Sequence, residues 1–262
     1  MKLATWNVNS LAVRLPQLLD WLNQQRPDAI CLQETKLTDD KFPHAELAAV
    51  GYRSEWFGQK TYNGVALLTR ADSADSAAVA VADVVKNIPG FDDPQARVIT
   101  ASVDGIRLIG AYIPNGQAPG TDKFAYKMRW LSALREWVAA ELSRHPKLVL
   151  VGDYNIAPED RDVYDPIAWA GQILCTPEER AHFHALTQIG LHDAFRLFEQ
   201  PAKSWSWWDY RMLAFRKNQG LRIDHILVSE ALKASVTACV IDKLPRKNER
   251  PSDHAPVVVE LG

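Results

Sequence analysis

The stretch Leu148-Val149-Leu150-Val151-Gly152-Asp153-Tyr154-Asn155 passes from a run of aliphatic residues directly into a glycine and two polar side chains. A continuous apolar run that ends in this way predicts a buried strand, with Asp153 and Asn155 at its carboxyl end. In open α/β sheets, ligand crevices form beyond such strand ends. The stretch therefore predicts both a buried sheet and the edge at which functional side chains lie.

The same pattern occurs at other predicted strands. The apolar residues before Asn7 and those before Glu34 form two more strands that end in polar side chains. Further strands are expected at residues 64–69, 98–103, 106–112, 223–228, 238–241 and 256–261, and helices at 14–25, 121–144 and 177–189. Because Asp104-Gly105 joins two of these strands as a hairpin, the sheets cannot be purely parallel. The fold class is α/β with mixed sheets.

Composition narrows the classes of protein further. The chain has 262 residues without a linker, repeat or abrupt change in composition, so we expect a single domain over residues 1–262. Three widely spaced cysteines form no disulfide or metal pattern, which indicates a reducing compartment. No apolar signal core or membrane-length segment is present. We expect a soluble cytoplasmic protein that does not bind membranes.

The net charge of −2 argues against a protein that coats nucleic acid by bulk charge, but the basic residues are unevenly distributed. Residues 203–222 contain five basic side chains against one acid, Asp209, and they interleave with Trp205, Trp207, Trp208 and Tyr210. Such aromatic and cationic residues can stack on bases and hold phosphates. Alternatively, the tryptophans are buried core beside a basic loop. Both interpretations remain open from the sequence.

The polar strand ends also predict a metal site. Carboxylate and amide oxygens that converge there suit Mg²⁺, which takes one or two carboxylates and keeps water and phosphate oxygens as its other ligands. Each such residue alone is more often a turn former or an N-cap, and a lone Asp253-His254 pair is more often a surface turn. Only the joint occurrence of these residues in a known order favours a functional site.

That order exists, and it resembles the exonuclease III family of abasic-site endonucleases, within the endonuclease/exonuclease/phosphatase superfamily. The motifs that carry the resemblance are, in order, Asn7-Val8-Asn9, Gln33-Glu34-Thr35-Lys36, Tyr112-Ile113-Pro114-Asn115, Gly152-Asp153-Tyr154-Asn155, Trp207-Trp208-Asp209-Tyr210-Arg211, Gly220-Leu221-Arg222-Ile223-Asp224 and Ser252-Asp253-His254. The resemblance covers essentially the whole chain. It implies a four-layer α/β sandwich of two packed mixed sheets flanked by helices.

The resemblance also implies roles for individual residues. Glu34 is expected to be the principal metal ligand, with Asn7 and Asp253 nearby, for Mg²⁺ with Mn²⁺ able to substitute. The catalytic residues would be Asp153 to orient or deprotonate the attacking water, Asn155 to hold its geometry, His254 oriented by Asp224, and Tyr112 at the phosphate or leaving oxygen. The substrate-binding residues would be Asn9, Asn115, Trp207, Trp208, Arg211, Leu221 and Arg222, while Asp162 would support the site indirectly.

Two positions depart from the family pattern. Asn9 stands where some relatives carry Asp, which leaves a second metal position in doubt, and Tyr154 stands where Phe or Leu is common. The implied activity is hydrolysis of the DNA backbone 5′ of abasic sites, with 3′→5′ exonuclease and 3′-end cleaning in some proportion, by a monomer that acts on double-stranded DNA and associates with the nucleoid in a bacterium. The alternatives are a phosphoesterase of the same fold that acts on lipid, inositol phosphate or RNA, and a non-catalytic DNA-binding module.

Overall fold

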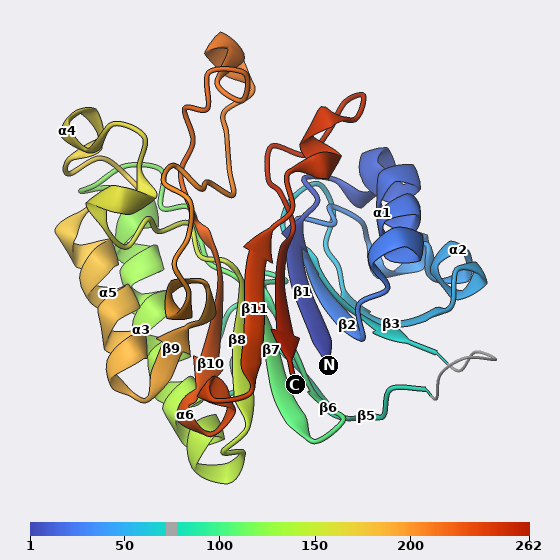
Figure 1. Cartoon of the computed structure of the whole chain (residues 1–262). Helices are drawn as coiled ribbons and strands as arrows, with labels where there is room; N and C mark the ends of the chain where they lie inside the picture. The colour runs from blue at the N-terminus through green and yellow to red at the C-terminus, as the bar shows by residue number, and fades with distance from the viewer. Residues whose placement is uncertain (72–77) are drawn as a thin grey trace.

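Two six-stranded sheets pack face to face in this computed structural model, which describes residues 1–71 and 78–262 (Figure 1). The first sheet consists, in spatial order, of β11 (Val236–Ile241), β12 (Val257–Leu261), β1 (Lys2–Asn7), β2 (Ala29–Gln33), β4 (Val65–Arg70) and β3 (Tyr52–Phe57). The second consists of β5 (Val81–Lys86), β6 (Val98–Val103), β7 (Ile106–Tyr112), β8 (Leu148–Asp153), β10 (Asp224–Ser229) and β9 (Leu191–Asp193). The β1–β2 and β7–β8 pairs are parallel and the remaining pairs are antiparallel, so the expected mixed sheets are confirmed.

Helices cover the two outer faces and complete the expected four layers. The helices α1 (Leu11–Gln25) and α2 (His44–Ala49) lie on the first sheet, while α3 (Asp122–Arg144) and α5 (Pro177–Gln188) lie on the second (Figure 1). The short helices α4 (Pro166–Trp169) and α6 (Glu230–Lys233) and several 3₁₀ turns lie in connections. Over the described residues, no helix has the length and apolar character needed to cross a membrane.

Apolar cores lie between the layers. The core between the sheets contains Leu3, Cys31, Leu108, Val151 and Ile226, which come from five strands of both sheets. Each of these side chains is essentially inaccessible to water, and full burial of one aliphatic side chain contributes roughly 1.5–3 kcal/mol. Because this core draws on both sheets, neither sheet buries its inner face without the other.

The alternation of side chains along the strands determines what lies at the rim of this core. Val149 and Val151 point between the sheets, so Asp153, two residues further along β8, points the same way. By the same period, Tyr112 at the end of β7 and Asp224 at the start of β10 lie on the inner faces. Asp153, one of the polar strand ends predicted from the sequence, therefore lies with Tyr112 and Asp224 at one edge of the intersheet core.

The close approach of β7 and β8 explains why a glycine precedes Asp153. A Cβ on Gly152 would lie 1.8 Å from the main-chain oxygen of Ala111, and the φ of Gly152 is 149°. Only glycine fits such a backbone contact without strain. This fit holds β8 against β7 immediately before Asp153.

Several elements differ from expectation. Helix α1 begins at Leu11, earlier than the expected position 14, and Pro16 lies inside it. The strands β3, β5 and β9 were not expected. Strand β5 is a largely exposed edge strand and β9 has three residues, so neither shows the apolar run or strict alternation that marks a strand in a sequence.

Candidate active site

Three functional side chains lie in one row across neighbouring strands. The register pairs Tyr112 of β7 with Asp153 of β8, and Asp153 with Asp224 of β10. Paired residues on one face of a sheet have Cβ atoms about 4.5–5.5 Å apart. Strand pairing therefore brings together residues that are up to 112 positions apart in sequence.

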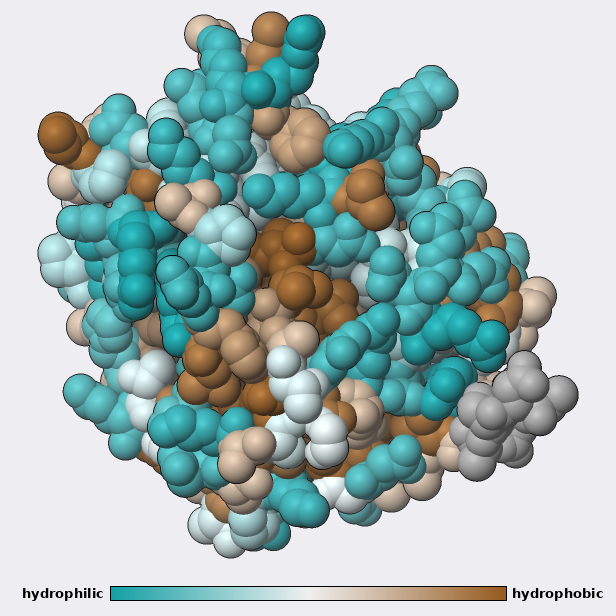
Figure 2. All heavy atoms as spheres, in the orientation of Figure 1, coloured by the Kyte–Doolittle hydropathy of each residue, from teal (hydrophilic) through white to brown (hydrophobic). Residues whose placement is uncertain are grey.

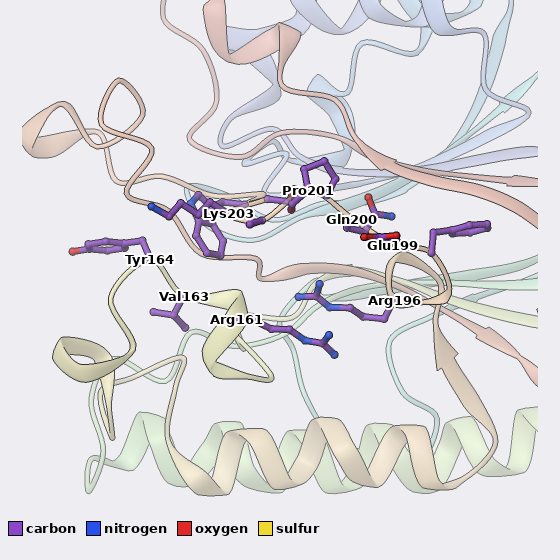
Figure 3. A pocket seen from close by; sticks show the side chains of 12 residues that line it. Arg161, Val163, Tyr164, Arg196, Glu199, Gln200, Pro201 and Lys203 are labelled. Atoms are coloured by element: carbon purple, nitrogen blue, oxygen red, sulfur yellow. Dashed lines mark hydrogen bonds between the residues drawn. The ribbon is translucent and has the colours of Figure 1, made fainter.

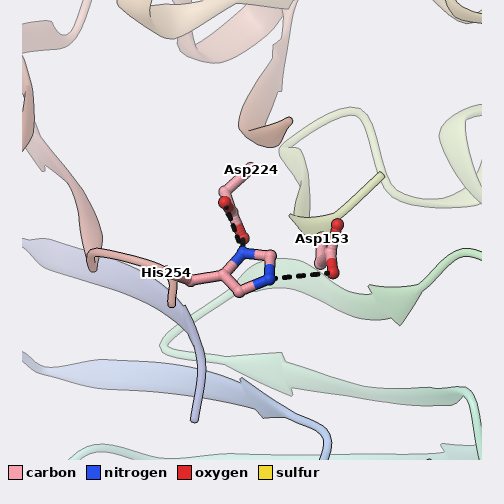
Figure 4. Close-up of side chains that lie close together, drawn as sticks. All are labelled: Asp153, Asp224 and His254. Carbon is pink, nitrogen blue, oxygen red and sulfur yellow. Dashed lines mark hydrogen bonds and ion pairs between the residues drawn. The ribbon is translucent and has the colours of Figure 1, made fainter. Parts of the chain in front are cut away.

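His254 completes this row from the loop that precedes β12. Its Nδ1 lies 2.9 Å from Asp224 Oδ2, and its Nε2 lies 3.8 Å from Asp153 Oδ2 (Figure 4). Burial opposes a charge on this ring, but the two carboxylates outweigh it and raise the pKa of His254 to about 10. The imidazole is thus a protonated donor whose ring orientation is set by Asp224.

Asp153 is buried at the centre of the cluster. The main-chain N–H of Asn155 donates to its Oδ1 over 2.9 Å, and Asn7 Nδ2 donates to its Oδ2 over 2.8 Å. Burial raises the pKa of Asp153 towards neutrality, with Asp224 and Glu34 adding to the rise and His254 opposing it. A carboxyl group with this pKa is suited to accept a proton near neutral pH.

Glu34 lies opposite Asp153, with φ 52° immediately after β2. Its Oε1 accepts hydrogen bonds from Asn7 Nδ2 and from the Tyr112 hydroxyl, both over 2.9 Å, and its Oε2 lies 2.8 Å from Lys36 Nζ. Burial opposes ionisation of Glu34, but Lys36 and the hydrogen bond from Asn7 hold its pKa below the ordinary value. Burial and the neighbouring Glu34 raise the pKa of Tyr112 well above its usual value, so the phenol stays neutral and acts as a donor.

The charge balance of the cluster fits a divalent cation. The site contains four carboxylates, those of Glu34, Asp153, Asp224 and Asp253. The cationic side chains that contact them in the pairs given above are two, Lys36 and His254. Excess buried negative charge of this kind is costly unless it is paired or coordinates a metal. Carboxylate oxygens are the donors that Mg²⁺ prefers. Asp153, Asp224 and His254 lie within 4.8 Å of one another, but the protonated ring of His254 has no lone pair for a metal, so the carboxylates are the candidate ligands.

Asn7, expected among the metal ligands, lies in the site and forms hydrogen bonds there. Its amide nitrogen donates to both Glu34 and Asp153, while its amide oxygen accepts from the main-chain N–H of Asn9. This network orients the amide with its nitrogen towards the carboxylates. In this arrangement Asn7 joins Glu34 to Asp153, and its place beside the metal, directly or through water, stays a prediction.

The outer side of the site contains two further groups of predicted residues. Asn115 Nδ2 donates to Asn155 Oδ1 over 3.1 Å. On the other side, Asp253 accepts from Asn9 Nδ2 over 2.9 Å and from Trp207 Nε1 over 3.0 Å. Asn115 and Asn9 therefore lie next to the cluster, and half-buried Trp207 borders it through Asp253.

Three predicted substrate contacts are placed in the interior instead. The exposed fraction is 0% for Trp208 and Leu221 and 1% for Arg222, whose guanidinium bonds Asp162 Oδ1 over 2.7 Å and Asp193 Oδ2 over 2.8 Å. A buried guanidinium with two carboxylate partners has no surface for DNA, so direct contact by these three residues is wrong. Arg222 instead links Asp162 to the start of β10, in line with the indirect role expected of Asp162.

Arg211 is exposed, as expected of a residue that contacts a ligand. Its guanidinium forms a two-point pair with Asp209 on the same turn. Met212 and Leu213 follow it in the same 3₁₀ turn, Arg211–Leu213, with 77% and 59% of their surface exposed. The 205–222 loop that contains this turn protrudes from the body of the molecule (Figure 1). This exposed apolar tip was not predicted from the sequence, because Met212 and Leu213 continue no periodic pattern.

Two other residues near the site were also missed. Arg97 lies with its guanidinium carbon 4.9 Å from the centre of the Tyr112 ring, a cation–π contact that holds the phenol in place. Lys127 lies beneath Asn115 and Asn155, with its Nζ bonded to both main-chain oxygens. Its spacing from Phe124 and Leu131 on one face of α3 could have shown that this lysine points inward.

A cavity of about 700 Å³ opens beside the cluster and is lined by Tyr112, Asn115, Arg97, Lys123 and Tyr62, among others. A second cavity, of about 480 Å³, lies between the 161–164 and 198–205 segments (Figure 3). Its Arg161 and Arg196 are each paired with a carboxylate, Glu159 and Asp162. The first cavity shares Tyr112 and Asn115 with the predicted site, whereas the second is lined by none of the site residues described above. The loops that protrude at the top of the molecule carry mainly hydrophilic residues (Figure 2).

A buried carboxylate that can accept a proton, an imidazolium, a neutral phenol and an excess of acidic oxygens are the groups that hydrolyse phosphoesters with metal assistance. The site therefore defines a phosphoesterase. The chain belongs to the Endonuclease/Exonuclease/phosphatase family, whose model matches residues 4–254.

Particular relatives are nucleases. The chain is 34% identical to exodeoxyribonuclease III of Haemophilus influenzae over the full length of both proteins, and 32% identical to the DNA repair nuclease APEX1 of Danio rerio over 100% of this chain and 82% of that protein. The structure resembles the 3′ phosphatase NExo from Neisseria bound to a product DNA hairpin, with a TM-score of 0.95, 48% identity and coverage of 100% and 99% of the two chains. It also resembles an AP endonuclease from Archaeoglobus fulgidus, with a TM-score of 0.92, 32% identity and the same coverage.

Proposed function

We propose that this protein is a DNA-repair phosphodiesterase that cuts the backbone 5′ of abasic sites and also removes nucleotides or blocking groups from 3′ ends. The observation that carries the proposal is the row of Tyr112, Asp153 and Asp224 with His254, facing Glu34 across the rim of the intersheet core. All three activities hydrolyse a phosphoester, so one cluster serves each of them.

The residues divide the chemistry as follows. Mg²⁺, with Mn²⁺ able to substitute, would be held by Glu34 with Asp253 nearby and would supply Lewis-acid stabilisation of phosphate charge. Asp153 accepts the proton of the attacking water, while His254 donates a hydrogen bond to a non-bridging phosphate oxygen. The neutral hydroxyl of Tyr112 lies within reach of the same centre and donates towards the leaving oxygen.

The DNA duplex is proposed to lie across the cavity beside Tyr112 and below the 205–222 loop. Exposed Arg211, Arg216 and Lys217 supply cations for backbone phosphates. The exposed apolar tip, Met212 and Leu213, suits insertion between base steps, a contact that bends a duplex and widens access to one nucleotide. Asn9, Asn115 and Trp207 border the scissile phosphate from the two sides of the cluster.

A second candidate is an enzyme devoted to 3′ ends, with little internal incision. It is favoured by the 48% identity to NExo, which is described as a 3′ phosphatase and as a 3′–5′ exonuclease. The chemistry is the same in both cases. The difference lies in whether the cavity admits a nucleotide from within a duplex or only from its end.

The remaining expectations stand as proposals. We propose that the protein acts as a monomer in the cytoplasm, in association with the nucleoid in a bacterium. A monomer suffices because each residue that we assign to the cluster comes from one chain.

The test uses two labelled duplexes, one with a central abasic-site analogue and one with a 3′-phosphate end. Each is incubated with Mg²⁺ or with EDTA, and Asp153→Asn is the matched control, since it removes the proton acceptor with little change in size. We expect Mg²⁺-dependent incision immediately 5′ of the lesion and release of the 3′ phosphate, with both lost in Asp153→Asn.

The outcomes separate the candidates. End processing without internal incision supports the enzyme devoted to 3′ ends. Failure both to cut and to bind either duplex, with folded protein in Mg²⁺, refutes the DNA assignment and directs attention to lipid, inositol phosphate or RNA substrates. Binding to DNA without any cleavage supports the non-catalytic module instead.

A further inference from the structure

A fully buried ion pair lies beneath the active site, between α3 and α5. The side chains of Lys127 and Glu179 are both 0% exposed, and Lys127 Nζ donates to Glu179 Oε1. The same ammonium donates to the main-chain oxygen of Asn155 over 2.7 Å and to that of Asn115 over 3.2 Å. Its three hydrogens thus have three acceptors, two of which belong to the predicted catalytic and substrate-binding asparagines.

Both oxygens of Glu179 are also engaged. Its Oε2 accepts from the main-chain N–H of Thr176 over 3.0 Å and from the Thr176 hydroxyl over 2.9 Å, as part of the capping box that begins α5. The ammonium is therefore held on one side by a carboxylate that is itself fixed. Lys127 has no freedom to turn away from the two asparagines.

Stability alone does not explain this pair. Burial lowers the pKa of Lys127 against the opposing pull of Glu179, a sign that the charge is costly at this position. Replacement of a buried ion pair by well-packed apolar residues is often neutral or stabilising. An effect other than stability is therefore needed to explain why a charged pair is buried between α3 and α5.

The atoms held by Lys127 lead directly to the reacting groups. Asn115 Nδ2 donates to Asn155 Oδ1 over 3.1 Å, and Asn155 N donates to Asp153 Oδ1 over 2.9 Å. Asn155 has φ 49°, a left-handed conformation that needs support from its surroundings. A small movement of either main-chain oxygen would therefore shift the carboxylate that accepts the proton.

We propose that Lys127 and Glu179 form a positioning pair that holds Asn115, Asn155 and, through Asn155, Asp153 in the geometry for phosphoester hydrolysis. The inference rests on the proposed function of this site. Neither residue touches the substrate, and both act through the asparagines. Loss of the pair is expected to lower kcat and leave the KM for the duplex nearly unchanged, because exposed Arg211, Arg216 and Lys217, to which we assign the backbone phosphates, are not altered.

The chain contains a matched control at the other end of α3. Arg107 and Glu141 form a second buried pair, 4% and 5% exposed, in which Arg107 also donates to the main-chain oxygen of Asp83 over 2.8 Å. Arg107 pairs with Leu148 at the start of β8, whereas Asp153 lies at its end. This pair resembles the first in burial and bonding but lies far along the strands from the cluster.

The experiment compares Lys127→Met with Arg107→Met in the full chain. Both variants are expected to lower the midpoint of urea unfolding. Lys127→Met is expected to lower kcat on the abasic duplex by about 10²-fold with KM within about twofold, a size typical of a misplaced catalytic group. Arg107→Met is expected to keep kcat within about twofold. In NMR spectra, the side-chain amide signals of Asn115 and Asn155 should shift in the first variant and stay in place in the second.

Glu179→Gln is the second variant, in case Lys127→Met does not fold. It keeps Lys127 and removes its counter-charge, and we expect a decrease in kcat of about tenfold. Unchanged kcat in a folded Lys127→Met or Glu179→Gln, or an equal loss in Arg107→Met, would overturn the positioning role. If the wild type cuts neither duplex, the proposed function has failed. The pair is then judged by the amide signals and by any phosphoester that the wild type does hydrolyse.

Discussion

Asp224→Asn removes the carboxylate that faces His254 Nδ1 at 2.9 Å, with almost no change in size. Burial alone would lower the pKa of His254, yet it is raised from 6.5 to about 10, with Asp224 the largest contributor to the rise and Asp153 the next. An adjacent opposite charge typically accounts for 1–3 pH units of such a rise. We therefore expect the pKa of His254 to decrease from about 10 to about 8 in this variant.

The same pKa values determine the direction in which the unfolding free energy changes with pH. Because the pKa of His254 is raised in the folded state, its contribution to the unfolding free energy is fully present below pH 6.5 and is lost as pH rises through about 10. The upper limit of that contribution is about 5 kcal/mol, from 1.36 kcal/mol for each pH unit. In Asp224→Asn we expect this contribution to the unfolding free energy to be smaller than in the wild type and to be lost by about pH 8.

The assay is an NMR titration of the imidazole signals in metal-free protein from pH 6 to pH 11. The signals of His254 among the seven histidines are assigned by their absence from His254→Gln. Asp209→Asn, which alters an acid paired with Arg211 on the protruding loop, is the control and should leave the pKa of His254 near 10. A pKa of His254 that remains near 10 in folded Asp224→Asn would refute the view that Asp224 holds the proton on this ring.

Further substitutions test other parts of the site. Tyr112→Phe removes the hydroxyl that donates to Glu34 Oε1 and should lower kcat by about 10²-fold in steady-state assays, with the unfolding midpoint nearly unchanged. Glu34→Gln should weaken Mg²⁺ binding at least about tenfold by calorimetry, and equal affinity would contradict the ligand assignment. Met212→Ser with Leu213→Ser should raise the KM for duplex DNA several-fold at constant kcat, and an unchanged KM would exclude insertion of the loop tip. Gly152→Ala should destabilise the fold by more than about 4 kcal/mol in urea titrations, since its Cβ would lie 1.8 Å from a main-chain oxygen of β7.

Much of the fold was predictable because its elements have strong local patterns. The strands at 98–103 and 106–112 match the structure at both ends, and the helix expected at 121–144 occurs as α3. Apolar runs and the helical spacing of apolar residues indicate that one face of a segment is buried. They therefore predict a strand or a helix wherever that buried face continues over several residues. The edge strand β5 and the three-residue β9 were missed because neither has such a face.

The 203–222 segment shows where local pattern was insufficient. Its aromatic and basic residues were compatible with a DNA-binding surface and with buried core, and in the structure Trp208 and Arg222 are buried while Arg211, Arg216 and Lys217 are exposed. Trp208 is covered by Arg246 from a distant loop at 5.7 Å, and Arg222 is neutralised by Asp162 and Asp193. The burial of these residues depends on partners that are remote in sequence, and no local period reports on such partners.

The sequence by itself determined which residues lie at strand ends, because the period-two alternation along an apolar run decides both where the strand ends and which face its last side chain takes. Asp153 was located in this way, whereas the place of Tyr112 in the site was implied by the family resemblance. Only the tertiary structure decided that they meet Asp224 and His254 in one row, that Asn7 turns its nitrogen towards two carboxylates, and that Lys127 lies beneath both asparagines. Strand register and helix packing join residues that are far apart in the chain, and these long-range contacts convert a set of polar strand ends into a site with defined proton positions.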